Sequence, residues 1–406
     1  MFLILLILSI IVLIPVAMFV LECLLSFLPV GKQSESVHTH PRPRLATVIP
    51  AHNEEAGIGD TVRDVVQQLA DGDRVLVVAD NCSDNTAEVA RQCGAEVAER
   101  HNLEQRGKSY ALEFGLEFLS DDPPEVVIFV DADCRLSSNS LTALATKADE
   151  MDRPVQGSYI FGGKEGSAAS NLASSLTLRF KNYIRPLGSA RLGMPCQLTG
   201  SGMAFPWYML QDVNVANGSL TEDAELGVDL ALAGYPPIFC AEAKIDGSVP
   251  KAWDAHVQQR RRWEQGYLQS ILTNAPKMFF KSLTSFRPSL LWSAMDLCIP
   301  PLALLGLAWF VTFCLALIAV AAGGSWLLLS MLSLGAVSMG ACIVLGWYIH
   351  CRNEVGLKSL LAIPWFVMRK VTIYFSLLFN REKSGSELSG IENPKIVVRL
   401  CLFHHL

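Results

Sequence analysis

Apolar residues are concentrated in two parts of this chain of 406 residues. Residues 1–30 are almost wholly apolar and residues 290–348 largely so, whereas short apolar runs alternate with polar ones between them. At about 1.5 Å per residue, a helix over residues 2–28 is long enough to cross the roughly 30 Å hydrocarbon core of a bilayer. Because this run has no basic start and no small-residue cleavage site, we interpret it as a retained anchor and not as a signal peptide.

The second apolar part predicts two further membrane spans, over residues 291–320 and 326–348, joined by a short turn. A last apolar stretch, residues 360–379, carries Arg369 and Lys370 at its middle. Each charge would cost about 2.5–3.5 kcal/mol at the centre of a bilayer. We therefore expect an interfacial amphipathic helix there instead of a fourth span.

Basic residues flank the polar region on both sides, and they indicate its orientation. They are Lys32, Arg42, Arg44, Lys277, Lys281 and Arg287. Since basic residues accumulate on the cytoplasmic side of membrane spans, we predict a multi-pass protein of the inner (plasma) membrane with its polar domain in the cytoplasm.

Within the polar region, short apolar strands alternate with helical patterns. Strands are predicted over residues 45–50, 74–78 and 126–130, and helices over about 55–69 and 85–93. Such alternation is typical of an α/β domain with a mainly parallel sheet, whose ligands bind beyond the carboxyl ends of the strands.

Composition fits a membrane-anchored domain. The apolar fraction of 51% and the positive mean hydropathy exceed what a soluble enzyme needs. A net charge of −6 offers no broad basic surface, so we do not expect nucleic acid as a partner. The eleven cysteines form no C-x-x-C pair, which indicates neither a zinc site nor a disulfide framework.

We therefore divide the chain into five parts. They are an anchor (1–30), a cytoplasmic domain (31–289), two membrane helices (290–350), an interfacial helix (351–380) and a tail (381–406) to which no role is assigned.

Four polar motifs follow one another through the domain. They are Asp80 in VVADNCSDNT, Asp131 and Asp133 in VVIFVDADC, Thr221-Glu222-Asp223, and Gln259-Arg260-Arg261-Arg262-Trp263. In this order they resemble the membrane-bound family 2 glycosyltransferases, the group that contains cellulose synthase, hyaluronan synthase, poly-N-acetylglucosamine synthase and ceramide glucosyltransferase. The resemblance implies a GT-A type fold that binds a nucleotide sugar.

On the donor side, the resemblance implies that the loop after the first strand, together with Asp80, binds the nucleotide. The loop residues are Pro50, Ala51, Asn53 and Glu54. Asn53 and Glu54 have an alternative interpretation as the N-cap and first-turn acid of the next helix. Lys108 precedes a predicted helix, where a cation and backbone N–H groups can meet a phosphate, although a solvated lysine is the alternative.

Asp131 and Asp133 are two residues apart at a strand end, so both side chains can face one cation. Carboxylates suit Mg²⁺ or Mn²⁺, which would neutralise the leaving diphosphate. The alternative is a pair of solvated strand-end acids.

On the acceptor side, the resemblance implies that Asp223 is the general base, with Glu222 beside it in the catalytic motif. Both acids also suit the first turn of a helix capped by Thr221. Gly200, Ser201 and Gly202 let the backbone approach a ligand, or they mark a β-bulge. Gln259, Arg262 and Trp263 share a helix face, from which Arg262 can clamp the diphosphate and Trp263 can stack on an acceptor sugar.

The function predicted from these features is an inverting, metal-dependent hexosyltransferase. It would use a nucleoside-diphosphate sugar, a UDP-sugar by resemblance, and a lipid-linked or polysaccharide acceptor at the membrane, in exopolysaccharide or glycolipid synthesis. A processive polysaccharide synthase, with partner subunits for export, stays open as the alternative. A catalytically silent membrane scaffold is the alternative of a different class, and the presence of all four aspartates argues against it.

Overall fold

The computed structural model describes residues 2–29, 42–161, 169–219, 221–247 and 253–379; for some helical residues, 169–172 and 253–261 among them, it describes the backbone alone. One sheet of eight strands dominates this described part, in the order β3-β2-β1-β4-β7-β6-β8-β5. The strands are β1 (Leu45–Ala51), β2 (Arg74–Asp80), β3 (Glu96–Arg100), β4 (Val126–Phe129), β5 (Cys134–Leu136), β6 (Val155–Phe161), β7 (Met203–Pro206) and β8 (Ile238–Gly247).

The sheet is mixed. The pairs β1/β2, β1/β4, β2/β3 and β6/β8 are parallel, whereas β4/β7, β6/β7 and β5/β8 are antiparallel. The expected parallel pairing therefore holds among the first four strands along the chain, and antiparallel pairs enter with β5 and β7.

Helices cover both faces of the sheet. Apolar residues of α2 (Ile58–Val66), α3 (Thr86–Gln92) and α5 (Ser140–Met151) pack on one face. Residues of α4 (Lys108–Leu119) and α8 (Glu222–Ala233) pack on the other. These covered faces explain the near-continuous apolar runs of the parallel strands.

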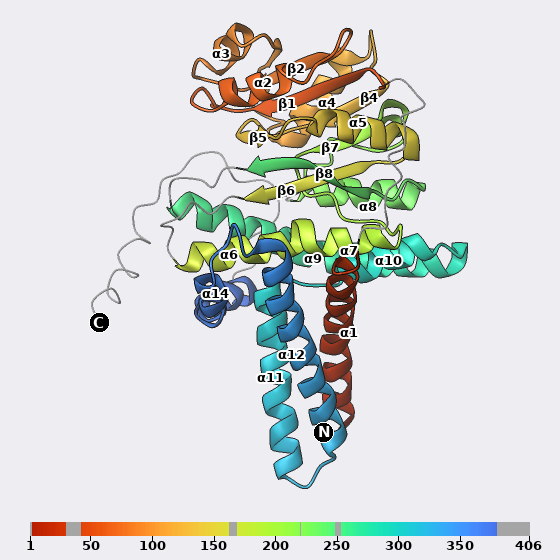
Figure 1. Ribbon diagram of the computed structural model, residues 1–406, viewed down its shortest axis with the longest axis vertical. Helices are drawn as coiled ribbons and strands as arrows, with labels where there is room; N and C mark the ends of the chain where they lie inside the picture. Colours follow the sequence, from red (N-terminus) through yellow and green to blue (C-terminus); the bar gives the residue numbers. More distant parts are fainter. Residues whose placement is uncertain (1, 30–41, 162–168, 220, 248–252, 380–406) are drawn as a thin grey trace, which may run out of the picture.

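Below the sheet lies a layer of helices that run across the ends of the apolar helices (Figure 1). It contains α6 (Ala169–Arg179), the π-helix η1 (Phe180–Ile184), α7 (Arg185–Arg191), α9 (Trp253–Ser285) and α10 (Pro288–Leu297). The short helix α13 (Lys358–Leu361) contacts α6, and helix α14 (Ile363–Phe379) lies beside this layer.

Three helices of the described chain are long and apolar enough to cross a membrane. They are α1 (Phe2–Ser26), α11 (Leu302–Ala321), and α12 (Trp326–Gly346) with its π-helical continuation η3 (Trp347–Cys351). They project together from the helical layer, away from the sheet (Figure 1). Helix α14, of 17 residues, is shorter than these three and lies outside the set, and the interfacial location expected for it stays a prediction.

The expected span over residues 291–320 begins too early. Residues up to Leu297 belong to α10, and the chain then breaks before α11 starts at Leu302. Pro300 and Pro301 explain the break, because proline lacks a backbone N–H and disfavours helical conformation in the residue before it.

A buried charge cluster joins the anchor to the helical layer. The Arg185 guanidinium donates to Glu22 Oε2 at 2.7 Å and also pairs with Asp296. All three residues are at most 6% exposed. Close packing adds to this junction, since a Cβ on Gly188 would lie 1.9 Å from the carbonyl oxygen of Glu22.

Replacing Arg185 with methionine should destabilise the protein by about 3–5 kcal/mol, because Glu22 and Asp296 would stay buried without a cation. The free energy of unfolding in detergent measures this loss. Arg135→Met is the matched control: Arg135 pairs with Asp64 at the surface, and its loss should cost less than about 1 kcal/mol. Equal losses for the two variants would contradict the role given to the buried cluster.

Candidate active site

The site lies at one edge of the sheet, where β1, β2 and β4 end. These strands are parallel and in register, with Ala51 opposite Ala79 and Val48 opposite Phe129. The loops that follow them therefore meet at that edge, as the sequence predicts.

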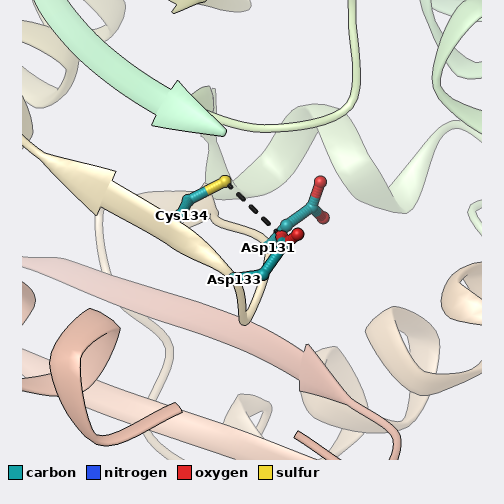
Figure 2. Close-up of side chains that lie close together, drawn as sticks. All are labelled: Asp131, Asp133 and Cys134. Carbon is teal, nitrogen blue, oxygen red and sulfur yellow. Dashed lines mark hydrogen bonds between the residues drawn. The ribbon is translucent and has the colours of Figure 1, made fainter. Parts of the chain in front are cut away.

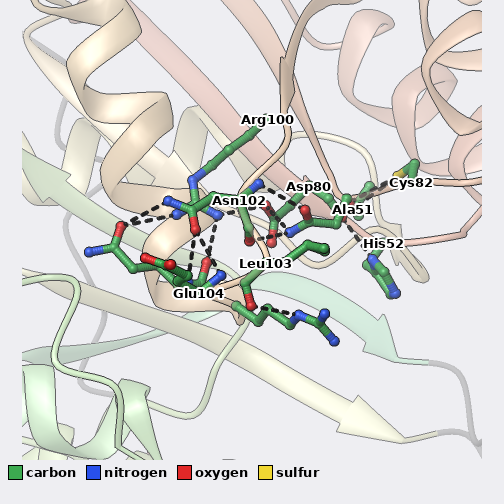
Figure 3. A network of polar contacts seen from close by, with 11 residues as sticks. Ala51, His52, Asp80, Cys82, Arg100, Asn102, Leu103 and Glu104 are labelled. Atoms are coloured by element: carbon green, nitrogen blue, oxygen red, sulfur yellow. Dashed lines mark hydrogen bonds and ion pairs between the residues drawn. The ribbon is translucent and has the colours of Figure 1, made fainter. Parts of the chain in front are cut away.

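Asp80, at the end of β2, is 6% exposed. Its Oδ1 accepts hydrogen bonds from Arg100 Nη1 at 2.8 Å and from Asn81 Nδ2 at 3.0 Å (Figure 3). In the described part of the chain, Oδ2 accepts no such bond. One carboxylate oxygen thus stays available for a donor such as the N–H of a nucleotide base.

The loop after β1 is tied to the loop after β2. His52 Nδ1 lies 2.7 Å from the Asp80 carbonyl oxygen, and Asn53 Oδ1 accepts a bond from Ser83 N at 2.8 Å. The Asn53 backbone is left-handed, with φ of 57°. The alternative of a helix cap at Asn53 is wrong, because α2 begins at Ile58 after Gly57.

Asp131, Asp133 and Cys134 each bring a potential ligand atom to one place, within 4.8 Å of one another (Figure 2). Asp131 also forms an ion pair with Lys108, the first residue of α4, which donates to the Gly200 carbonyl oxygen as well. The sequence placed Lys108 near phosphate, and the structure brings it directly to the Asp131 carboxylate.

Burial decides which of these groups suits a cation. Burial raises the pKa of the Asp131 carboxyl, although the nearby Lys108 ammonium lowers it. Burial also raises the pKa of Glu54, in the loop after β1, and the charge of Asp133 adds to that shift. Burial raises the pKa of the Cys134 thiol much further, so this thiol stays neutral and is a poor ligand for a hard cation. The donor set therefore consists of the Asp131 and Asp133 carboxylates, which fit Mg²⁺ or Mn²⁺.

The Gly200–Gly202 segment, directly before β7, forms another side of the site. Ser201 is fully buried, and its Oγ accepts a bond from Asp131 N at 3.0 Å. Gly200 has φ of 102°, and a Cβ there would lie 3.3 Å from Asp223 Oδ2. The β-bulge interpretation is not supported, because the register shift of the sheet lies elsewhere, between Gly157 and Ser158.

Glu222 and Asp223 begin α8, and Thr221 is its N-cap residue without a capping bond from its side chain. Burial raises the pKa of Glu222 to about 7; Lys108 and Arg262 oppose this shift, whereas Asp223 adds to it. A Cβ on Gly200 would lie 3.3 Å from Asp223 Oδ2, 3.8 Å from Lys108 Nζ and 4.0 Å from Asp131 Oδ2, so these three side chains meet at Gly200.

The Q-x-x-R-W motif lies on α9. Arg262 is exposed and acts electrostatically on Glu222. The Trp263 ring is half-buried, and its centroid lies 6.1 Å from that of Phe161 at an angle of 54°. The Gln259 side chain lies outside the described residues.

Sequence reasoning missed two cations near the site. One is Arg100, which pairs with Asp80. The only sign of this residue in the sequence was a charge at the end of a strand in which polar and apolar residues alternate. Lys181 acts electrostatically on Asp223, but it lies on the π-helix η1, whose irregular turn no periodicity predicts.

The pKa of Glu222 gives a pH prediction. An acid whose pKa rises from 4.5 to about 7 on folding binds its proton more readily in the folded chain, so its contribution to stability falls as pH rises through this window. Glu222→Gln removes that loss. In metal-free buffer, the variant should gain in unfolding temperature relative to wild type between about pH 5 and about pH 8. If the difference in unfolding temperature between the variant and wild type did not change with pH, the burial of this acid would be contradicted.

The chain is similar to known proteins. A family model described as "Glycosyltransferase like family 2" matches residues 41–266. A probable glycosyltransferase of Bacillus subtilis, YdaM, is 25% identical over 261 residues, which cover 59% of this chain and 58% of that protein. A dolichyl-phosphate hexose transferase of Haloferax volcanii is 30% identical over 193 residues, covering 47% of this chain and 78% of the relative.

A solved structure shares the fold. The mannosyltransferase PcManGT from Pyrobaculum calidifontis, solved with GDP-Man and Mn²⁺, is 19% identical, with a TM-score of 0.52 over 92% of this chain and 100% of that one. This likeness bears out the expected GT-A type architecture. With a family model that matches more than half of its residues, the chain belongs to glycosyltransferase family 2.

Proposed function

We propose that this glycosyltransferase moves a hexose from a nucleoside-diphosphate sugar, a UDP-sugar by resemblance, to an acceptor held at the membrane. One observation carries the proposal: Asp223, Lys108 and Asp131 surround Gly200 at the ligand-binding edge of the sheet. The helical layer directly beneath this sheet carries three helices that are apolar enough to span a membrane.

The donor binds along the ends of β1, β2 and β4. Asp80 accepts a hydrogen bond from the nucleotide base through Oδ2. The neighbouring loop contributes Pro50, Ala51, Asn53 and Glu54. Asp131 and Asp133 would hold Mg²⁺ or Mn²⁺, which when bound neutralises charge on the leaving diphosphate. Lys108, and Arg262 from α9, add positive charge on the same side.

The transfer itself requires one base. The acceptor oxygen attacks the anomeric carbon from the face opposite the diphosphate, a C–O bond forms as the bond to the nucleoside diphosphate breaks, and the acceptor proton passes to Asp223. One displacement inverts the anomeric centre. Glu222, with a pKa near 7, influences the charge of the site next to this base.

The membrane location and the group within the family are also proposals. The Arg262-Trp263 pair beside the site supports kinship with the membrane-bound synthases, and the basic flanks support a cytoplasmic domain at the inner membrane. The name of the Haloferax relative supports a lipid-linked acceptor. The presence of Asp80, Asp131, Asp133 and Asp223 argues against a silent scaffold.

Asp223→Asn should lower the rate of transfer by about 10²–10⁴-fold, because the amide cannot accept the proton. Nucleotide binding, measured by calorimetry, should remain. Asp229→Asn, on the same helix but half-buried away from these groups, is the matched control and should keep its activity. Transfer by Asp223→Asn at the wild-type rate would show that the base is misassigned.

Chelation of divalent metal should stop transfer, and added Mg²⁺ or Mn²⁺ should restore it. Asp133→Asn should raise the metal concentration needed for half-maximal rate and should weaken Mn²⁺ binding measured by electron paramagnetic resonance. Full activity in excess chelator would refute the proposed role of these carboxylates.

A further inference from the structure

An open pocket lies where the helical layer meets the apolar helices. The walls come from α6 and η1, from α9, from the loop before α11, and from α14.

One wall of this pocket is apolar and continues into the proposed membrane. It consists of Ile299, Pro300, Pro301, Leu302 and Phe366. Leu302 is also the first residue of the candidate span α11. An apolar chain lying on this wall would therefore pass directly into the hydrocarbon region.

Three cations also line the pocket, and two of them are neutralised. Arg185 is paired with Glu22 and Asp296, and Lys370 is paired with Glu264. Lys181 differs: no carboxylate of the described chain forms an ion pair with it. Its Nζ lies 5.0 Å from the centre of the Tyr267 ring, a contact that attracts the cation but does not neutralise it.

Lys181 also faces the catalytic side. A second, smaller cavity is lined by both Lys181 and Thr199, the neighbour of Gly200. Trp263, next to Arg262 of the family motif, lines the large pocket itself. Lys181 points this way because it lies on the π-helix η1, where an extra residue in the helical turn changes the direction of the side chain.

We propose that this pocket binds a lipid with a phosphate-bearing head, the head pairing with Lys181 and the apolar chain lying along Pro300, Pro301 and Phe366. The inference rests on the proposed function, for which it specifies the class of acceptor. Beside an apolar wall, a cation that forms no ion pair with any described carboxylate favours an amphiphilic anion over either a neutral lipid or a soluble anion.

The test measures binding of farnesyl phosphate, farnesol and inorganic phosphate to the full chain in nanodiscs of zwitterionic lipid. Farnesyl phosphate should bind more tightly than either of the others. Lys181→Gln should weaken that binding at least about tenfold, the effect of losing a hydrogen bond between charged groups, whereas Lys181→Arg should largely retain it. Lys281→Gln, which removes an exposed charge from α9, is the control and should bind as wild type does.

Equal affinity for farnesol would overturn the proposal in favour of a purely apolar site, and equal affinity for inorganic phosphate would overturn it in favour of a soluble anion. Thr177→Trp, which fills the pocket from α6, should abolish farnesyl phosphate binding even if Lys181→Gln does not fold; retained binding would place the lipid elsewhere. Donor binding to the wild-type chain is measured separately. Its absence would contradict the proposed function, whereas donor binding without lipid selectivity would contradict this site alone.

Discussion

The parallel pairing of β1 with β2 and with β4 is the constraint on which the site depends. It brings the loops after three strands to one edge, so Asp80 and Asp131 lie at the same edge of the sheet although 51 positions separate them in the chain. A shift of one residue in either pairing would turn every side chain of that strand to the opposite face. The apolar residues buried on both faces prevent such a shift, and the core thereby fixes the geometry of the polar groups.

A second constraint connects this edge to the apolar helices. Arg185 holds α1 and α10 through two buried ion pairs, and Gly188 allows the anchor backbone to touch α7. The π-helix η1 directly precedes Arg185, so Lys181 lies one helical turn before the residue that holds the anchor. The junction with the anchor and the proposed acceptor pocket are therefore parts of one structural unit.

The sequence was sufficient for features governed by local periodicity and by motifs. Strands β1, β2 and β4, the GT-A type fold, and the apolar character of three helices all follow from short patterns whose burial is nearly uniform along each element. Asp131 and Asp133 lie together as expected but for a different reason: β4 ends at Phe129, and a turn brings the two carboxylates together where strand alternation was expected to do so. The start of α11 was misjudged, since hydropathy continues through Pro300 and Pro301 while the backbone does not.

Features made by contacts between distant residues could not be predicted. The Arg100–Asp80 pair depends on strand order, and the Lys108–Asp131 pair depends on how α4 packs over β1 and β2. The position of Lys181 requires a helical irregularity that leaves no trace in composition. Burial likewise gives Glu222 its high pKa, and a neighbouring sequence motif does not reveal burial.

The most direct test of the account is release of nucleoside diphosphate by the purified full chain in native membrane lipid, screened over UDP- and GDP-sugars. The account predicts release with one donor, together with a glycosylated lipid recovered from the same membranes. Measurable binding of nucleotide without release from any donor, in the presence of those lipids, would contradict a transferase and would favour a scaffold.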